Sequence, residues 1–211
     1  MDNSVEQWQS LRLGKFTASE VYKLLVRGKS KDVVFGEVAM TYIKDKACEI
    51  LTGETEQLSS KAMEWGTYQE SYAIAAYTKQ YGEVEYYGNN SPVFIEYSEY
   101  SGGSPDAISE THLIEAKCPY RSVNHLENLL LTPETFPKKR HEYYAQMQFN
   151  MLLTKKELAH FVSYDPRMAC EEQQLAVIEI PADKEFQNLL TERIGLAEKE
   201  LTELLTEIVS K

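Results

Sequence analysis

The fold is constrained most by two short predicted strands that carry charged side chains where buried strands are normally apolar. Asp106 lies on the first strand, and Glu115 and Lys117 lie on the second, across a tight turn. Side chains two positions apart leave the same face of a strand, so Glu115 and Lys117 point together. The apolar Ile114 and Ala116 then point the other way, as expected of a strand near the centre of a sheet.

This pattern favours a bound cation. An unpaired charge on a buried strand face costs several kcal/mol, so charges there need a partner. Two carboxylates, Asp106 and Glu115, can hold a hard ion such as Mg²⁺, and Lys117 can orient or deprotonate a water beside it. That is the chemistry of phosphodiester hydrolysis. The alternative is a solvated hairpin with a surface Glu–Lys pair, which contributes little stability.

The composition predicts a soluble globular protein with one domain over residues 1–211. Hydrophobic residues make up 43% of the chain and charged residues 26%. No apolar run approaches the ~20 residues of a membrane span, and the first residues lack the layout of a secretory signal. Three widely spaced cysteines indicate reduced thiols and argue against a zinc site, so we expect a cytoplasmic protein without a membrane partner.

The net charge of −11 argues against a nucleic-acid-binding protein, because such proteins usually carry a basic surplus. The argument is not decisive. A nuclease that encloses its substrate needs a basic lining only inside its channel, and an acidic exterior limits loose association with DNA.

Start and stop signals predict helices first, a compact sheet in the middle and alternating elements at the end, which is an α/β or α+β arrangement. A capping box at Thr17–Glu20 predicts a helix that continues to about Val26. Further helices are expected at Val34–Leu51, Ser60–Tyr81, Lys138–Leu153 and Lys184–Val209. Strands are expected at Val84–Tyr87, Val93–Tyr97, Asp106–Ile108, Leu113–Cys118, Ala159–Tyr164 and Leu175–Ile180.

Other candidate residues each have a structural alternative. Glu70 lies on a predicted helix four residues after Gly66, which leaves space for another backbone or a substrate, but an exposed helical glutamate is the favoured interpretation from the residues alone. Arg12 precedes a predicted helix start that carries Ser19. A helix N-terminus with a nearby arginine can bind a phosphate, and plain helix capping explains the same residues equally well.

Two glutamines occupy an apolar helical segment. Gln146 and Gln148 lie about 200° apart around a helix, so they cannot both face one site. We expect one of them to be a buried polar group that needs a partner and the other to be solvated. His160 alternates into a predicted strand, where a structural role is expected.

Six segments in order along nearly the whole chain resemble the lambda exonuclease and YqaJ-type viral recombinase family, within the PD-(D/E)xK nuclease superfamily. These segments are Leu11–Val21, Trp65–Glu70, Ser104–Asp106, Glu115–Pro119, Tyr144–Gln148 and Tyr164–Met168. The resemblance implies an α/β fold with a restriction-endonuclease-like core, in which helices flank a central mixed β-sheet.

The resemblance also implies a function. It implies a Mg²⁺-dependent exonuclease that degrades the 5′-ended strand of double-stranded DNA and leaves a 3′ overhang for phage-type homologous recombination. Mn²⁺ is expected to substitute for Mg²⁺. The resemblance further implies a ring-shaped homotrimer, a single-strand annealing protein as partner, and a phage or prophage gene expressed in the bacterial cytoplasm. Alternatives are an endonuclease on the same fold and a non-catalytic DNA-end-binding protein.

Site residues follow from the same resemblance. The implied metal ligands are Asp106, Glu115, the Ala116 carbonyl and Glu70, which reverses the favoured interpretation of Glu70 given above. Lys117 would position the attacking water, and Gln146 would support the water or the scissile phosphate. The implied contacts to DNA are a 5′-phosphate pocket at Arg12, Ser19 and Ser104 and a wedge at Met63 that separates the duplex end.

Overall fold

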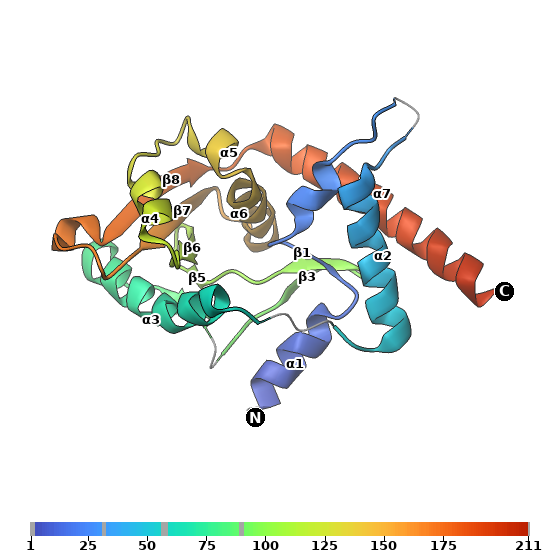
Figure 1. Cartoon of the computed structure of the whole chain (residues 1–211), viewed down its shortest axis with the longest axis horizontal. Coiled ribbons are helices and arrows are strands. Elements are labelled where there is room, and N and C mark those ends of the chain that lie inside the picture. The colour runs from blue at the N-terminus through green and yellow to red at the C-terminus, as the bar shows by residue number, and fades with distance from the viewer. Residues whose placement is uncertain (1–2, 31–32, 56–58, 89–90, 211) are drawn as a thin grey trace.

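The computed structural model describes residues 3–30, 33–55, 59–88 and 91–210, and it contains two mixed β-sheets flanked by helices (Figure 1). The helices are α1 (Asn3–Arg12), η1 (Val21–Leu25), α2 (Glu37–Thr52), α3 (Lys61–Tyr81), α4 (Ser122–Leu129), α5 (Phe136–Lys139), α6 (His141–Thr154), η2 (Glu171–Gln173) and α7 (Lys184–Val209). The strands are β1 (Phe16–Thr17), β2 (Glu85–Tyr86), β3 (Ile95–Ser98), β4 (Ser101–Gly103), β5 (Ala107–Ile108), β6 (Leu113–Lys117), β7 (Leu158–Tyr164) and β8 (Leu175–Pro181).

The larger sheet has the strand order β2-β5-β6-β7-β8, so β6 lies at its centre as its apolar alternation predicts. Strands β6 and β7 are parallel, and the other neighbours in this sheet are antiparallel. A parallel pair needs a crossover connection, which α4, α5 and α6 supply here. The smaller sheet has the order β1-β4-β3 and precedes the larger one through the short link from β4 to β5.

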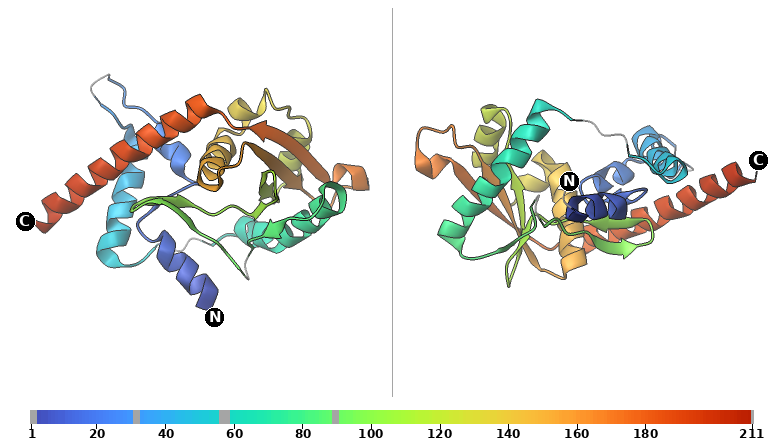
Figure 2. Two further views of the ribbon diagram at one scale, coloured as in Figure 1. Left: turned by 180° about the vertical axis from the view of Figure 1, so that it is seen from behind. Right: turned by 90° about the horizontal axis from the view of Figure 1, so that it is seen from below.

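Helices cover both faces of the larger sheet. Apolar side chains of α3, including Ala73 and Tyr77, pack against Ile114 of β6. On the opposite face, Met147 of α6 packs against Leu113. Figures 1 and 2 show α3 and α6 on the two sides of these strands. Burial on both faces explains why any charged side chain on β6 must find its partner inside the protein.

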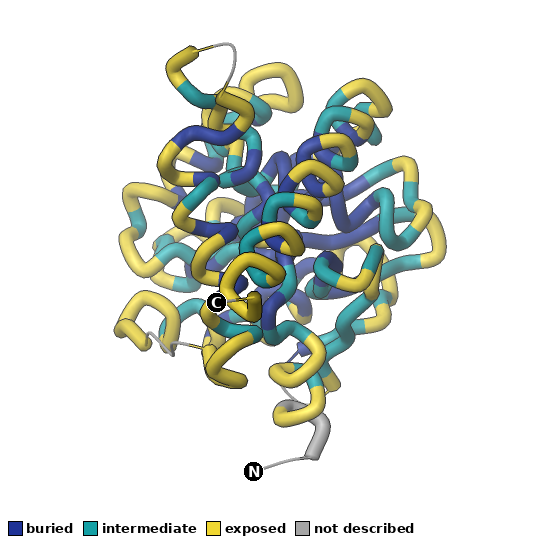
Figure 3. The backbone as a smooth tube through the Cα atoms, turned by 90° about the vertical axis from the view of Figure 1, so that its right-hand side faces the viewer, coloured by how far each residue is buried: buried dark blue, intermediate teal, exposed yellow. Residues whose placement is uncertain are grey.

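A second helical layer lies beyond α6. Helices η1, α2 and α7 enclose a core that includes Phe16, Tyr42 and Phe149, and the buried segments gather at the centre of the molecule in Figure 3. The last turns of α7 extend past this core toward the C-terminus (Figure 2). Among the described residues, no helix combines the length and apolarity that crossing a bilayer requires.

Several predicted elements are confirmed with small shifts at their ends. Helix α3 begins after Ser60, whose Oγ accepts a hydrogen bond from the Met63 amide at 3.2 Å, and it ends at Gly82. Helix α2 begins three residues later than predicted and ends at Gly53, which adopts the left-handed conformation that glycine favours. Helix α7 has the predicted bounds.

The predicted capping box at Thr17 is wrong. Thr17 belongs to β1, which pairs in parallel with β4, and the following helix is the short 3₁₀ helix η1. Glu20 pairs with Lys23 and does not reach back to Thr17. Phe16 is fully buried with its ring centroid 5.4 Å from that of Tyr42, so burial of Phe16 draws this segment into the sheet.

Several elements and one helix break have no counterpart in the sequence-based prediction. Helices α1, α4 and η2 and strands β1 and β4 were not expected, and the predicted helix Lys138–Leu153 is divided into α5 and α6 at Arg140. Arg140 donates from Nε to Asn128 Oδ1 and from Nη2 to Glu127 Oε2, each at 2.8 Å. These contacts to α4 are tertiary, so local propensity does not reveal the break.

Candidate active site

Strand pairing brings Asp106 beside β6. Strand β5 pairs with only the first part of β6, through Ala107 with Ile114 and Ile108 with Leu113. The Ala116 amide lies beyond that pairing and donates to Asp106 Oδ2 at 2.7 Å. The residue that precedes β5 therefore places its carboxylate near the C-terminal end of the central strand.

Glu115 and Lys117 leave the same side of β6, as predicted, and this side faces α6. The Glu115 side chain has no exposed surface, and its Oε1 lies 2.5 Å from Lys117 Nζ. Lys117 Nζ also lies 5.3 Å from the ring centroid of Tyr143 on α6. The interpretation of this pair as a solvated surface pair is therefore wrong.

Burial makes the charged forms of these carboxylates less favourable than in water. Burial, together with the charge of Asp106, raises the pKa of Glu115 to about 8. Burial also raises the pKa of Asp106 above its ordinary value. Burial alone would lower the pKa of Lys117, but the charges of Glu115 and Asp106 outweigh it and raise that pKa. Lys117 is therefore charged, which suits it to orient a water and not to deprotonate one.

Glu70 reaches the same cluster from α3. Tyr86 of β2 donates a hydrogen bond from its hydroxyl to Glu70 Oε1 at 2.9 Å. Burial and the charge of Asp106 raise the pKa of Glu70 to about 7. The interpretation of Glu70 as an ordinary exposed glutamate is wrong, because this side chain interacts with the acidic cluster.

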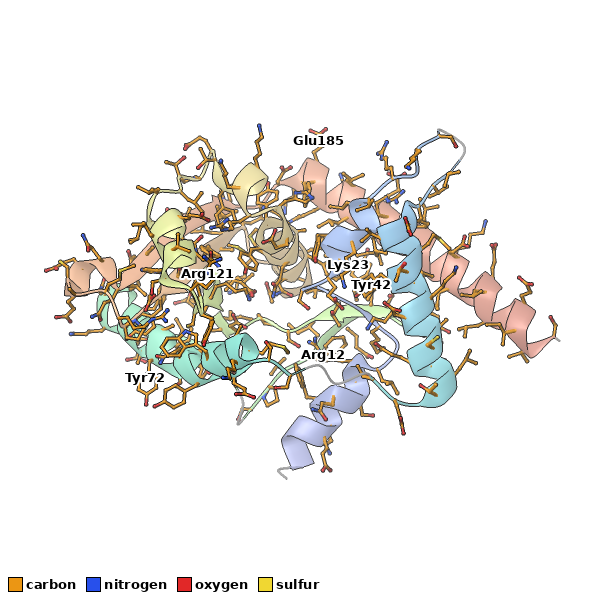
Figure 4. The ribbon with its side chains drawn as sticks, viewed as in Figure 1. Arg12, Lys23, Tyr42, Tyr72, Arg121 and Glu185 are labelled. Carbon is orange, nitrogen blue, oxygen red and sulfur yellow. The ribbon has the colours of Figure 1, made fainter. Side chains whose placement is uncertain are left out.

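A pocket of about 260 Å³ joins Glu70 and Asp106 to residues far apart in the sequence. Its lining residues are Trp8, Arg12, Ser19, Thr67, Glu70, Tyr87, Gly88, Pro92, Ser104, Pro105, Asp106 and Gln146. Arg12 lies at the end of α1 that meets the sheet (Figure 4). The structure thus brings six of the predicted site residues to one cavity. Glu115 and Lys117 lie beside this cavity and do not line it.

The end of the pocket at Arg12 is suited to an anion. The Arg12 guanidinium lies 4.4 Å from the Trp8 ring centroid and donates to Ser104 Oγ at 3.3 Å. Trp8 Nε1 donates to the same oxygen at 2.9 Å. Because Ser104 Oγ accepts both bonds, its own hydrogen is available to a ligand. Burial lowers the pKa of Arg12, although the nearby charges of Glu20 and Glu49 act in the opposite direction.

The remaining predicted residues have different surroundings. Gln146 is buried in the pocket wall, whereas Gln148 donates to the Pro181 carbonyl and accepts from the Asp183 amide. The prediction that the two cannot share a site is confirmed, but neither is solvated. Ser19 is exposed at the pocket, and Met63 is 56% exposed in the first turn of α3, outside the pocket lining.

The donor set fits a hard divalent cation. Asp106, Glu115 and Glu70 could supply oxygen ligands, and together they can carry more negative charge than Lys117 neutralises. In the described part of the chain, no three His, Cys, Asp or Glu side chains form a complete metal cluster. An ion would therefore complete its shell with the Ala116 carbonyl, water or a phosphate, as Mg²⁺ commonly does.

Sequence analysis missed the residues that hold the predicted ones in place. Tyr86, Trp8 and Asn150 all contact predicted site residues. Trp8 precedes Arg12 by four positions, a spacing that becomes informative only once α1 is known to be a helix. Asn150 follows Gln146 by the same interval on a mostly apolar helix, and this signal was available from the sequence.

Residues 7–157 match the YqaJ-like viral recombinase domain. The chain belongs to this family. The match includes every predicted site residue, from Arg12 to Gln146. No curated protein sequence matches the chain.

Solved structures agree with the family assignment. The chain is similar to an alkaline exonuclease of Laribacter hongkongensis, LHK-Exo, with 29% identity, a TM-score of 0.79 and coverage of 97% of this chain and 96% of that chain. The complex of LHK-Exo with dAMP has 29% identity, a TM-score of 0.78 and coverage of 96% and 95%. A phage-related exonuclease of Haemophilus somnus 129PT, at 20% identity, a TM-score of 0.74 and coverage of 92% and 96%, supports the fold alone. The YqaJ-like chain therefore has the PD-(D/E)xK fold, with helices around a central mixed sheet.

Proposed function

We propose that this protein is a Mg²⁺-dependent 5′-to-3′ exonuclease that acts on ends of double-stranded DNA and leaves 3′ overhangs. Membership of the YqaJ-like viral recombinase family and similarity to LHK-Exo support a nuclease of the phage-recombination type. The observation that carries the proposal is the composition of the pocket. One end has an arginine and a serine with free hydrogen-bond donors, and the other end has clustered carboxylates.

This composition suits a substrate with two phosphates. A terminal 5′-phosphate at Arg12, Ser19 and Ser104 would hold the first nucleotide in the pocket, and the next phosphodiester would then lie toward the carboxylates. Arginine and hydroxyl donors bind phosphate through charge-assisted hydrogen bonds. The LHK-Exo structure with dAMP supports a pocket of mononucleotide size.

In the proposed reaction, the oxygen of a water attacks the phosphorus and the bond from phosphorus to the 3′ oxygen breaks. The water loses a proton to solvent, and the 3′ oxygen takes up a proton to leave a 3′-hydroxyl on the released nucleotide. Asp106, Glu115, the Ala116 carbonyl and Glu70 would hold Mg²⁺, which when bound makes water a stronger nucleophile and stabilises charge on the phosphate. Lys117, charged beside Glu115, would orient the attacking water. Gln146 would hold the water or the scissile phosphate from the pocket wall.

Direction follows from the product. Cleavage between the first two nucleotides leaves a new 5′-phosphate on the shortened strand, and this group can enter the Arg12 end of the pocket. Met63, exposed at the start of α3, would separate the duplex end as a wedge. The proposal includes Mn²⁺ as a substitute for Mg²⁺, a homotrimeric ring around DNA, a single-strand annealing partner, and a phage or prophage origin with action in the bacterial cytoplasm.

Digestion of linear duplex DNA labelled at the 3′ ends tests the proposal. We expect Mg²⁺-dependent shortening from the 5′ ends, faster with a 5′-phosphate than with a 5′-hydroxyl, and no digestion in EDTA. Closed circular DNA should remain intact, since an end-dependent enzyme cannot begin on it. Cleavage of circles would support an endonuclease, and binding of ends without digestion would support a non-catalytic protein.

Variants assign the chemistry to named residues. Lys117→Ala and Asp106→Ala should abolish digestion while the proteins remain folded and bind DNA. Lys199→Ala, at an exposed lysine of α7, is the matched control and should digest normally. Arg12→Ala should reduce the preference for phosphorylated ends, and an unchanged preference would remove Arg12 from the phosphate site. Wild-type digestion by Lys117→Ala would contradict the assigned reaction.

A further inference from the structure

Asn150 of α6 contacts both the pocket wall at Ser104 and the buried Glu115 beside the pocket. Its side chain is fully buried, one helical turn after Gln146. Its Nδ2 lies 3.5 Å from the Ser104 carbonyl oxygen and 3.5 Å from Glu115 Oε2. These bonds are long, but one amide group contacts both the segment that presents Ser104 and the innermost carboxylate of the site.

The orientation of this amide follows from chemistry. The Ser104 carbonyl and the Glu115 carboxylate are both acceptors, so the NH₂ group must face them, with one hydrogen for each. Asn150 Oδ1 then points toward Gly103 and has no hydrogen-bond partner within the described part of the chain. A buried amide oxygen without a partner lowers stability, so packing efficiency does not explain an asparagine here.

The strand beside Asn150 is fitted closely to it. A Cβ on Gly103 would lie 2.2 Å from Asn150 Oδ1, 2.8 Å from Leu153 Cδ1 and 2.9 Å from Ala18 Cβ. No residue with a side chain fits at position 103 unless its neighbours move. The end of β4, and with it Ser104, is therefore held against α6 at a fixed distance from Glu115.

We propose that Asn150 is a positioning residue that fixes the spacing between the 5′-phosphate site at Ser104 and the catalytic carboxylate Glu115. This inference rests on the proposed function and assigns to Asn150 the positioning of Ser104 relative to Glu115. Trp8 and Arg12 hold the Ser104 hydroxyl on one side, and Asn150 holds the Ser104 carbonyl on the other. A bound phosphate then places the next phosphodiester at the carboxylates because Asn150 ties the two sites together.

Substitution of Asn150 should affect the rate of cleavage and not the affinity for a phosphorylated DNA end. The side chains of Arg12, Ser19 and Ser104 remain when Asn150 is changed, so the affinity advantage of a phosphorylated end should persist. The rate advantage of that end should fall, because the bound phosphate no longer sets the position of the scissile bond. A residue that only stabilises the fold would lower both rates in proportion and leave their ratio unchanged.

The test compares wild type, Asn150→Ala and Asn150→Ser, whose hydroxyl is too short to reach both acceptors. Fluorescence anisotropy in EDTA measures the affinity for blunt duplexes with 5′-phosphate or 5′-hydroxyl ends. Initial rates with Mg²⁺ on the same duplexes, corrected for the folded fraction from thermal unfolding, give the rate ratio. We expect the affinity ratio to stay within about twofold of wild type and the rate ratio to fall about fivefold or more.

Gln148→Ala is the matched control, since Gln148 is an equally buried amide on α6 that bonds only to residues outside the pocket. It should lower stability and leave both ratios unchanged. An unchanged rate ratio in both Asn150 variants overturns the inference, and if Asn150→Ala does not fold, Asn150→Ser decides. A loss of the affinity ratio in EDTA also overturns it, because Asn150 would then act on binding itself. If the wild-type protein shows no Mg²⁺-dependent digestion or no preference for phosphorylated ends, the proposed function is wrong, and the inference about Asn150 is overturned with it.

Discussion

Glu115 illustrates how single residues create a buried acidic site. It has no exposed surface and lies beside Asp106, and Glu70 adds a third acid to the same region. Lys117 can neutralise only one of them. Ionising the remaining carboxylates in a buried site is costly unless another positive charge is present, so the raised pKa values of Glu70 and Glu115 are what the proposed Mg²⁺ site requires of its metal-free form.

Tyr86→Phe should weaken cation binding without changing the fold. The substitution removes the hydroxyl that donates to Glu70 Oε1 at 2.9 Å and leaves the ring in place. This hydrogen bond lowers the pKa of Glu70, against the larger effect of burial. Without it, protons compete more strongly with Mg²⁺ for the carboxylate, so the Mg²⁺ concentration for half-maximal digestion should rise about threefold or more. Calorimetric titration with Mg²⁺ gives the same comparison without turnover. Tyr72→Phe, on the exposed outer side of α3 (Figure 4), is the control, and an equal effect there would exclude a role for Tyr86.

At the scale of elements, helix α3 contains a glycine that stability alone does not explain. Nothing lies within 4 Å of a Cβ built on Gly66, and the same holds for Gly195 in α7. Alanine at either position should stabilise the protein by about 0.5–1 kcal/mol, because glycine is unfavourable inside a helix. Gly66 lies between Met63 and Glu70, so we expect Gly66→Ala to slow digestion and Gly195→Ala to leave it unchanged. Denaturant unfolding and initial rates measure both effects, and equal rates would show that DNA does not approach Gly66.

The contact between α3 and β7 should make the stability of the protein depend on pH. Tyr77 shares its hydroxyl with His112 and His160 at 2.6 Å each, and the two imidazole rings stack at 4.0 Å, near Glu179 and Lys156. Burial, together with His112, lowers the pKa of His160 from 6.5 to about 4. The unfolded chain therefore binds more protons between these values, and stability that is complete above pH 6.5 falls as the pH decreases toward 4.

His160→Gln should remove much of this dependence. Between pH 7 and pH 5 we expect the free energy of unfolding of wild type to fall about 1–2 kcal/mol more than that of the variant. Urea unfolding at the two pH values measures the difference. Parallel decreases in the two proteins would assign the acid sensitivity to carboxylates elsewhere.

Elements were predictable from sequence where local signals agreed with tertiary structure. Ser60 and Gly82 mark the ends of α3, and the alternation around Glu115 identified the central strand. Thr17 carried an equally clear helix-start signal and yet lies in β1, because pairing with β4 and burial of Phe16 outweigh a local cap. Long-range pairing of this kind leaves no local pattern to recognise.

At the scale of the whole molecule, the sequence identified the site residues with unusual chemistry but not the residues that support them through long-range contacts. The residues that carry chemistry were identified, since carboxylates and lysine on a buried strand are unusual in themselves. Their supports were not, because Trp8, Tyr86 and Asn150 are ordinary residues whose role depends on partners up to 96 positions away. The net charge of −11 is not explained by the site, because only three of the 33 acidic residues, Glu70, Asp106 and Glu115, lie there.

Cation binding should therefore stabilise the entire fold. An ion that binds only the folded state, at a free concentration tenfold above its Kd, adds about 1.4 kcal/mol. For a chain of this size, that corresponds to an increase in Tm of about 3–6 °C on addition of Mg²⁺. Asp106→Asn should raise the Tm in EDTA, because it removes one of the mutually repelling charges, and it should lose the increase caused by Mg²⁺. Asp45→Asn, at an exposed aspartate of α2, should behave as wild type in both conditions. Thermal unfolding of the three proteins with EDTA and with Mg²⁺ makes the comparison, and an equal Mg²⁺-induced increase in Asp106→Asn would place the cation elsewhere.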